Sequence, residues 1–415
     1  NGNGNGRFGH SVSMSANGSR VVVGVPHYGS YPNTNGRVHV YGRVYAGSWT
    51  KMAEGVEQAG NGDLLTGVLD GSTNNQSTAE FGRSVSMTSD GNRIVVGAPG
   101  YVYSEPGNLG NQNPDNGCAV VYDFAGTPAK WNKGNTPFTS ASIPHNTSST
   151  SVSGGPSYGS KSGWSVAISG DGSRMVVGAP LYTSKYNSGY PDQVIGCAGV
   201  YTVATPSTSA SAHTLLGDLI YDFIRQAPNP NAKRFEMGRD VAISDDGNRV
   251  AVSGHYTAGE TLTGNTVTNC GIVRTYHWSV EWYDQPPPIG TGPTPNGTFK
   301  WNRLGLKTRG NVGGKVPASS SGSHISQSAY ELSSTEQGIY TNSYYGKSVS
   351  LSGTGHLLAV GCPGGYWSGN PTSAANGITP GWVRVFSNSS NGTRYSYQWA
   401  GNALSIPTES YTHDT

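Results

Sequence analysis

The sequence predicts an all-β protein: a β-propeller, most simply of five blades with four antiparallel strands each. First, a phrase of about nineteen residues occurs five times, most clearly at Phe81–Pro99 as FGRSVSMTSDGNRIVVGAP. Second, each copy is followed by another apolar strand and then by a more polar one. Third, charged residues make up only 12% of the chain and glycine numbers 61, which is typical of turn-rich β-structure. We therefore expect a single propeller domain over residues 1–415.

Each copy of the phrase predicts a β-hairpin. Val85 and Met87 alternate with polar residues, which indicates a strand. Asp90-Gly91 then predicts a two-residue type I′ turn, because both central residues of that turn need a positive φ. The apolar run Ile94–Val96 is typical of a strand covered on both faces. The other copies place their turns at Asn17-Gly18, Asp171-Gly172, Asp246-Gly247 and Thr354-Gly355.

A third and a fourth strand complete each predicted blade. The third strands are Gly36–Tyr41, Gly117–Tyr122, Gly196–Tyr201, Cys270–Tyr276 and Gly381–Phe386. The fourth strands are marked in all but the third unit by Trp49, Trp131, Trp301 and Trp399. The expected blades span approximately 1–73, 74–155, 156–230, 231–338 and 339–415. The long fourth unit contains a proline-rich insertion at 283–297.

Crowding at the propeller axis predicts small side chains along the first strands. Ser84 and Ser86 fit this pattern, and Asp240 breaks it. A carboxylate there needs a partner such as Arg239, Arg249 or hydroxyls of the next blade. Asp240 is either a hydrogen-bonded substitute for serine or an acid that acts in the central channel.

The motifs FG-x-S-V, S-x-D-G-x-R and V-V-G-A-P resemble the FG-GAP repeats of integrin-α-type β-propellers, over essentially the whole chain. The resemblance implies a possible calcium site in the loop between the first two strands. Calcium needs six to eight oxygen ligands, and only Asp245-Asp246 offers two carboxylates in that loop. We expect no cofactor, with calcium at Asp245 and Asp246 as the exception to test.

Few residues suggest catalysis or binding to charged polymers. The chain contains no H-E-x-x-H or G-x-S-x-G motif, and we predict no catalytic residues. A net charge of +2 gives no reason to expect nucleic acid as a partner. No apolar run approaches the ~18 residues of a membrane-spanning helix.

The four cysteines favour at least one disulfide. Cys118, Cys197 and Cys270 occupy the same position in consecutive blades, which should hold them too far apart to pair easily. Cys270–Cys362 is the best candidate and leaves Cys118 with Cys197. Buried thiols are the alternative.

Tyrosine-rich loops between the second and third strands predict a binding face. Tyrosine among small polar residues provides rigid amphipathic contact area, although the same side chains could instead pack on the propeller rim. The residues expected on this face are Tyr28, Tyr31, Tyr101, Tyr103, Tyr182, Tyr186, Tyr190, Tyr256, Tyr366 and Trp367.

Glycosylation sequons favour a secreted or cell-surface glycoprotein. They stand at Asn17, Asn75, Asn146, Asn296, Asn388 and Asn391. Asn17 is expected in a turn between first and second strands, and Asn296, Asn388 and Asn391 in loops between third and fourth strands. These lie on the face opposite the tyrosines.

Together these features lead us to predict a non-enzymatic extracellular module, structural or adhesive, that contacts other proteins or copies of itself. It could be a building block of a surface appendage or matrix. A lectin-like propeller that binds glycans is the alternative, and a hydrolase with a site on the propeller axis is the third class.

Overall fold

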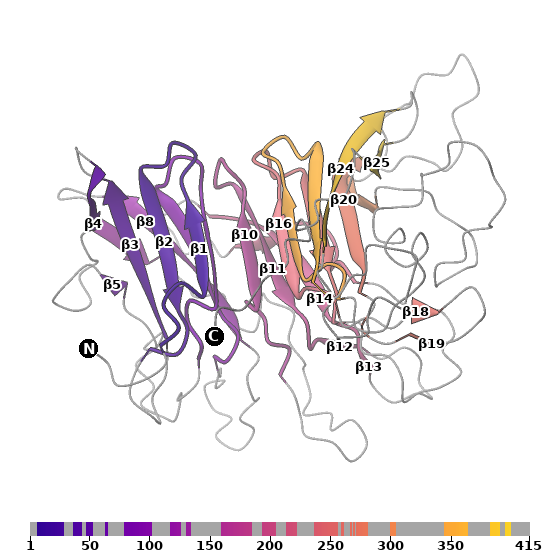
Figure 1. The fold of residues 1–415 in the computed structure, drawn as a ribbon, viewed down its shortest axis with the longest axis horizontal. Coiled ribbons are helices and arrows are strands. Elements are labelled where there is room, and N and C mark those ends of the chain that lie inside the picture. Colours follow the sequence, from indigo (N-terminus) through magenta and orange to yellow (C-terminus); the bar gives the residue numbers. More distant parts are fainter. Residues whose placement is uncertain are drawn as a thin grey trace, which may run out of the picture.

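The protein is an all-β, five-bladed β-propeller (Figure 1). The computed structural model describes residues 6–28, 36–43, 47–52, 63–64, 79–101, 117–125, 130–133, 159–184, 193–204, 213–221, 236–255, 259–260, 266–267, 269, 271–280, 299–303, 344–363, 382–390 and 395–399. Within these ranges there is no α-helix, and no helix is long and apolar enough to span a membrane.

Five four-stranded antiparallel sheets follow one another along the chain. The first two contain β1 (Ser11–Met14), β2 (Arg20–Val25), β3 (Arg37–Arg43) and β4 (Trp49–Lys51), then β6 (Ser84–Met87), β7 (Arg93–Ala98), β8 (Cys118–Ala125) and β9 (Lys130–Lys133). The third contains β10 (Ser165–Ile168), β11 (Arg174–Ala179), β14 (Cys197–Thr202) and β15 (Thr214–Leu215). The fourth contains β16 (Asp240–Ile243), β17 (Arg249–Ser253), β20 (Val273–Val280) and β21 (Phe299–Arg303). The fifth contains β22 (Ser348–Leu351), β23 (Leu357–Cys362), β24 (Trp382–Ser390) and β25 (Tyr395–Trp399).

The four strands of each blade are paired in chain order, so no blade borrows a strand from another. Short additional pairings extend the loops: β5 (Asp63–Leu64) pairs with β3, β12 (Thr183–Ser184) with β13 (Gln193–Val194), and β18 (Gly259–Glu260) with β19 (Thr266–Val267). The predicted strand count and order are confirmed. The blade boundaries stay predictions, and the insertion at 283–297 lies outside the described residues.

The turn between the first two strands differs from the type I′ turn that Asp-Gly predicts. Gly91 has a φ of 72°, but Asp90 is not among the described residues with positive φ. Gly91 N–H donates to the Thr88 carbonyl at 2.9 Å, and Thr88 N–H to the Arg93 carbonyl at 3.0 Å. The Asp90 carboxylate accepts from the Thr88 hydroxyl at 2.6 Å and the Asn92 amide at 2.9 Å. The turn is therefore a longer loop capped by its aspartate.

Neighbouring blades approach each other backbone to backbone near the axis. The first strands β1, β6, β10, β16 and β22 pack against one another in this order. The Ser84 hydroxyl donates to the Gly163 carbonyl of the next blade at 3.0 Å. A Cβ at Gly97 would lie 2.0 Å from that same carbonyl oxygen. Ser11 and Ser165 repeat the bond with Gly82 and Gly238, so the predicted small residues have a direct role.

An arginine at the start of the second strand ties each of the first four blades to the next. Its Nη1 donates to a carbonyl in the following blade's turn, in the pairs Arg20 to Gly91, Arg93 to Gly172, Arg174 to Gly247 and Arg249 to Thr354. In the fifth blade this position is Leu357.

We expect Arg93→Met to lower the free energy of unfolding by about 2–3 kcal/mol. Arg93 donates to Gly172 at 2.7 Å and pairs with the nearly buried Asp123 at 2.6 Å, so the substitution leaves both acceptors without this donor. Urea denaturation measures the loss. The matched control is Leu357→Met, where no such bond exists, and an equal loss in both variants would contradict the assigned role.

The first blade exposes a face that the other blades bury. Phe8 is 62% exposed, whereas Phe81, Met237 and Tyr345 at the same repeat position are 0% exposed. In those blades the residue lies beside the third strand of the preceding blade, through bridges such as Gly36 to Phe81. The aromatic residue of the FG motif is therefore buried at Phe81 and Tyr345 and exposed at Phe8. The reason is that, among the described strands, β22 of the fifth blade does not pack against β1 as β1 packs against β6.

The cysteines are buried thiols at Cys118, Cys197 and Cys362, so the predicted disulfides that involve them are wrong. In the β ladders, Cys118 lies opposite Ala98 of the second blade and Cys197 lies opposite Ala179 of the third. The two cysteines are therefore in different blades. Burial raises the pKa of the Cys197 thiol well above its usual range. Cys270 lies outside the described residues.

Candidate functional site

A turn repeated in every blade builds a cluster of charged side chains at one end of the axis. Just before each first strand, one residue that is not glycine has a φ between 51° and 56°. These residues are Arg7, Glu80, Lys161, Glu236 and Tyr344. Three residues later the chain enters the inner strand with His10, Arg83, Trp164, Arg239 and Lys347. We call these ten residues the axial mouth.

Hydrogen bonding in this turn places the two positions of each blade side by side. The amide of Arg83 donates to the Glu80 carbonyl at 3.0 Å, and that of Lys347 to the Tyr344 carbonyl at 3.0 Å. Arg83 also forms an ion pair with Glu80 at 2.8 Å. Arg239 donates its Nε to Glu236 at 2.6 Å. Left-handed backbone at residues with side chains is costly, and such strain is found at functional sites.

Cations from two blades lie over one aromatic ring in the mouth, and a third cation lies beside a histidine. The guanidinium carbons of Arg83 and Arg239 lie 3.5 Å and 4.3 Å from the centroid of the Trp164 ring. Lys347 Nζ lies 3.5 Å from Nε2 of His255. Burial lowers the pKa of Lys347, and Arg239 and Arg83 lower it further. These groups therefore share one electrostatic environment.

Like charges also affect the histidines. The pKa of His255 falls to about 3 because its side chain is buried and because Lys347 and Arg239 are close. Burial, followed by the charge of Arg83, lowers the pKa of His10. Both imidazoles are thus held neutral near pH 7, as neutral donors or acceptors at the edge of the mouth.

Asp240 lies beside this cluster, at the start of β16. Its Oδ2 accepts from the Val349 amide of the fifth blade at 2.7 Å, and Oδ1 from the Val241 amide at 3.1 Å. Burial raises its pKa to about 7, although both hydrogen bonds and Lys347 oppose the shift. The expected arginine partners are wrong, because Arg239 binds Glu236 and Arg249 binds Thr354. A carboxyl with this pKa can exchange a proton near neutral pH.

The charge of the mouth is predominantly positive. Its cations outnumber its carboxylates, which are Glu80 and Glu236. Arginine and lysine side chains that converge on one point bind carboxylate or phosphate groups, and an aromatic ring adds a surface for stacking. The arrangement can therefore hold a small anion next to a proton-exchanging carboxyl.

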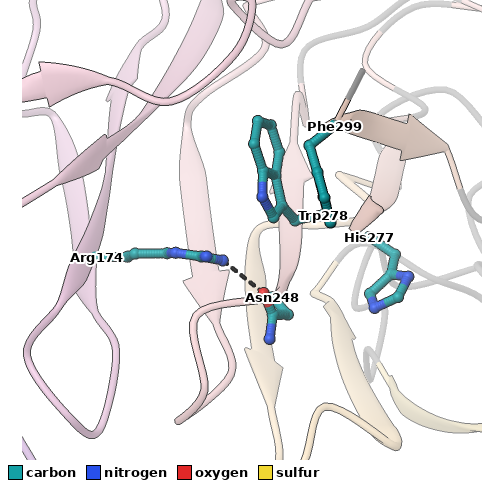
Figure 2. A pocket seen from close by; sticks show the side chains of 5 residues that line it. All are labelled: Arg174, Asn248, His277, Trp278 and Phe299. Atoms are coloured by element: carbon teal, nitrogen blue, oxygen red, sulfur yellow. Dashed lines mark hydrogen bonds between the residues drawn. The ribbon is translucent and has the colours of Figure 1, made fainter. Parts of the chain in front are cut away.

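A second hollow lies between the third and fourth blades, with a volume of about 440 Å³ (Figure 2). Arg174, Asn248, His277, Trp278 and Phe299 line it. Arg174 donates to Asn248 at 2.6 Å and so takes part in the bond between blades. Trp278 and Phe299 stack with ring centroids 6.1 Å apart. The hollow is open to solvent and adjoins the strand turns, away from the axial mouth.

The predicted tyrosine face is only partly described. Tyr101 is 1% exposed and belongs to the core, so it is not on a binding face. Tyr28 is partly buried under the guanidinium of Arg37, 3.9 Å from its ring centroid, and Tyr182 packs against the core. These three residues pack on the propeller, which was the alternative to a binding face. Outside the described residues lie Tyr31, Tyr103, Tyr186, Tyr190, Tyr256, Tyr366 and Trp367.

The predicted calcium residues have structural contacts. Asp246 accepts from the Ser244 hydroxyl at 2.5 Å and from the Asn248 amide at 2.9 Å. Asp245 donates its amide to the Gly353 carbonyl of the fifth blade at 2.7 Å. Across the described ranges, no group of three or more His, Cys, Asp or Glu side chains could share a metal ion.

The sequons are placed as follows. Asn17 is in the exposed turn that was expected, where its side-chain oxygen accepts from the Ser15 hydroxyl. Asn388 lies within β24, opposite Tyr397, so its placement in a loop is wrong. Outside the described residues lie Asn75, Asn146, Asn296 and Asn391.

Comparisons with known proteins give no family for the chain. No family model matches it, and no curated protein matches it in sequence. Among solved structures, a candidate 6-phosphogluconolactonase from Bacteroides uniformis ATCC 8492 is 8% identical with a TM-score of 0.40, covering 96% of this chain and 85% of that one. A periplasmic gluconolactonase from Pseudomonas aeruginosa is 10% identical with a TM-score of 0.36, covering 95% and 85%. The tricorn protease is 8% identical with a TM-score of 0.38, covering 92% of this chain and 26% of that one.

These comparisons correct the functional prediction. The predicted non-enzymatic structural or adhesive module is not supported, since the similar propellers carry the names of enzymes. The likeness itself is one of fold, and the chemistry has to be argued from the axial mouth.

Proposed function

We propose that the protein is an enzyme that binds a small anionic substrate at the axial mouth, with Asp240 as the proton-exchanging group. The observation that carries the proposal is that Lys347 lies close to Asp240, whose pKa is about 7, while Arg83 and Arg239 act on Lys347 from the neighbouring part of the mouth. Binding supplies orientation, and the carboxyl supplies general acid–base catalysis.

Hydrolysis of a sugar-acid lactone fits this arrangement. The Asp240 carboxylate would take a proton from water as the water oxygen bonds to the lactone carbonyl carbon. The ring C–O bond then breaks, and the proton returns to the departing alkoxide oxygen. The product is a hydroxy carboxylic acid, which releases its proton to solvent and becomes a carboxylate, the group that the arginines and Lys347 are suited to bind.

Calorimetry with gluconate and inorganic phosphate tests the binding step. We expect Arg239→Gln to weaken binding at least roughly tenfold, because charged hydrogen bonds contribute about 1.5–3 kcal/mol. Arg43→Gln is the matched control, since Arg43 is exposed at the end of β3. No binding of either anion to the parent protein, or equal binding by both variants, would remove the support for this site.

Lactone hydrolysis, followed by acid release, tests the catalytic step. Asp240→Ser should abolish turnover of glucono-δ-lactone while anion binding persists. In the parent, the rate should rise with pH through about 7, because the base must be ionised. Turnover unchanged in Asp240→Ser would show that this carboxyl is not the base.

The proposal keeps two expectations from the sequence. The resemblance to FG-GAP repeats is supported by the motifs in all five blades, and export from the cytoplasm by the sequons. Glycopeptide mapping on protein from its native source tests the second.

A further inference from the structure

The two ends of the row of blades expose the two halves of one interface. On the first blade, Val12 and Met14 are 65% and 55% exposed, whereas Val85 and Met87 at the same positions of the second blade are 8% and 6% exposed. With Phe8, these residues form an apolar surface, which we call the leading face. Isolated exposed apolar residues are ordinary, but a set whose counterparts are buried or partly buried in every other copy indicates an interface.

The fifth blade exposes the opposite half. Leu357 is 45% exposed, and Val383 is 39% exposed, whereas Val273 at the position of Val383 in the fourth blade is 1% exposed. Ser348 and Ser350 on β22 are exposed as well. We call this surface the trailing face. It corresponds to the side of each earlier blade that receives the next one.

The space around two glycines supports this pairing. Gly82, Gly163, Gly238 and Gly346 are packed against the preceding blade, each with an atom within 2.8 Å of an added Cβ. Gly9 at the same position has nothing within 4 Å. Gly361 on the trailing face meets only Ser348 of its own hairpin, whereas Gly97 meets the carbonyl of the next blade.

The repeated interfaces fix the rotation from one blade to the next. Four interfaces use the same parallel bridge, and four use a donor to the following turn. These four interfaces do not bring β22 back to β1: the two strands are not packed together as the other neighbouring first strands are. In Figure 1 the indigo first-blade hairpin and the orange fifth-blade hairpin stand apart, with β10 seen between them.

We propose that the leading face binds the trailing face of a second copy of this chain, head to tail. Both halves are present on one molecule, and the pairing would continue an interface that the fold already forms within the chain. Such a heterologous contact either closes into a ring or continues from copy to copy.

The residues at the two faces suit this contact. By the pattern of Ser84 and Gly163, Ser348 of one copy would donate to the Gly9 carbonyl of the next. Leu357 takes the place of the arginine that packs over the following turn, so it would lie near Gly18 and Met14. In the chain, Gly91 packs in this way on the side-chain carbons of Arg20. The contact between copies is therefore more apolar than those between blades.

Light-scattering mass measurements across a wide concentration range test the association. The parent protein should grow in mass with concentration. Val12→Asp blocks the leading face and Leu357→Asp blocks the trailing face, so each variant alone should remain a monomer. An equimolar mixture should form dimers and nothing larger, because one intact leading face meets one intact trailing face. Phe299→Asp, which changes an exposed aromatic residue on the fourth blade, is the control and should associate like the parent.

Circular dichroism checks that each variant is folded, and Met14→Glu replaces Val12→Asp if that variant is not. A parent that stays monomeric at every concentration would overturn the proposal, since the faces would then be covered within one chain. Dimers in either single variant would also overturn it, because they require a contact other than head to tail. The readout is mass alone, so it is independent of substrate binding at the axial mouth.

Discussion

Gly97→Ala should lower the free energy of unfolding by at least about 3 kcal/mol, whereas Gly361→Ala should change it by less than about 1 kcal/mol. The two glycines hold the same position in the second and fifth blades. An added Cβ at Gly97 would meet the Gly163 carbonyl oxygen at 2.0 Å and Ser84 Oγ at 2.4 Å. Backbone of a neighbouring blade cannot move away without separating the sheets, so the clash has no inexpensive relief.

At Gly361 the added Cβ meets Ser348 Oγ at 2.5 Å and then nothing closer than 3.7 Å. The Ser348 hydroxyl is exposed and can rotate away. Urea denaturation at low protein concentration, where copies are apart, measures both variants. Equal destabilisation at the two positions would show that the fifth blade is packed as tightly as the second. A Gly361→Ala variant that is stable but no longer associates would agree with contact between copies.

Asp240→Ser should become more stable relative to the parent as pH rises from about 5 to 8, by about 1–3 kcal/mol. The folded pKa of Asp240 is about 7, and the unfolded value is near 3.9. Between these values the folded parent binds more protons than the unfolded chain, so the contribution of Asp240 to stability falls as pH rises. Below pH 4 the contribution is fully present, and above about 7 the loss is complete.

Serine at this position has a defined acceptor, because Ser165 in the preceding blade donates to the Gly238 carbonyl at 2.9 Å. Thermal unfolding of both proteins at several pH values measures the difference. Lys347 and His255 are present in both proteins, so most of their own titration cancels in the comparison. A stability difference that does not change with pH would mean that Asp240 is ionised throughout this range.

Much of the fold could be predicted from the repeated phrase. The alternation around Val85 and the apolar run at Ile94–Val96 locate β6 and β7, and repetition then gives the other blades. The turn type was missed because Asp-Gly suits two loops. The carboxylate of Asp90 caps the longer one through the Thr88 hydroxyl, a contact that depends on a residue outside the predicted turn.

The exposed leading face could not be predicted from the repeated phrase, since the sequences that follow Phe8 and Phe81 are closely similar. Whether the row closes depends on the rotation between blades, which arises from backbone contacts such as Ser84 to Gly163. One signal was present in the sequence. Leu357 stands at the start of the second strand of the fifth blade, where the first four blades have the arginine that donates to the following turn.

The axial mouth was missed for a different reason. Five of its ten residues occupy the variable position of FG-x-S-V, which a comparison based on the conserved positions of the motif does not examine. Aligning the copies gives His10, Arg83, Trp164, Arg239 and Lys347 in one column. That column predicts where the side chains meet, but the pKa of Asp240 depends on burial between two blades and needs the structure.

The left-handed turn before each first strand keeps one backbone conformation while its side chains differ from blade to blade. Its backbone is the same at residues as different as Lys161, Glu236 and Tyr344. The conformation therefore does not depend on the side chain that adopts it, and it is the same at Arg7 in the first blade as in the others. Each blade thus contributes two side chains of differing chemistry at fixed points around the axis. A new specificity could evolve, or be engineered, one blade at a time while the scaffold stays unchanged.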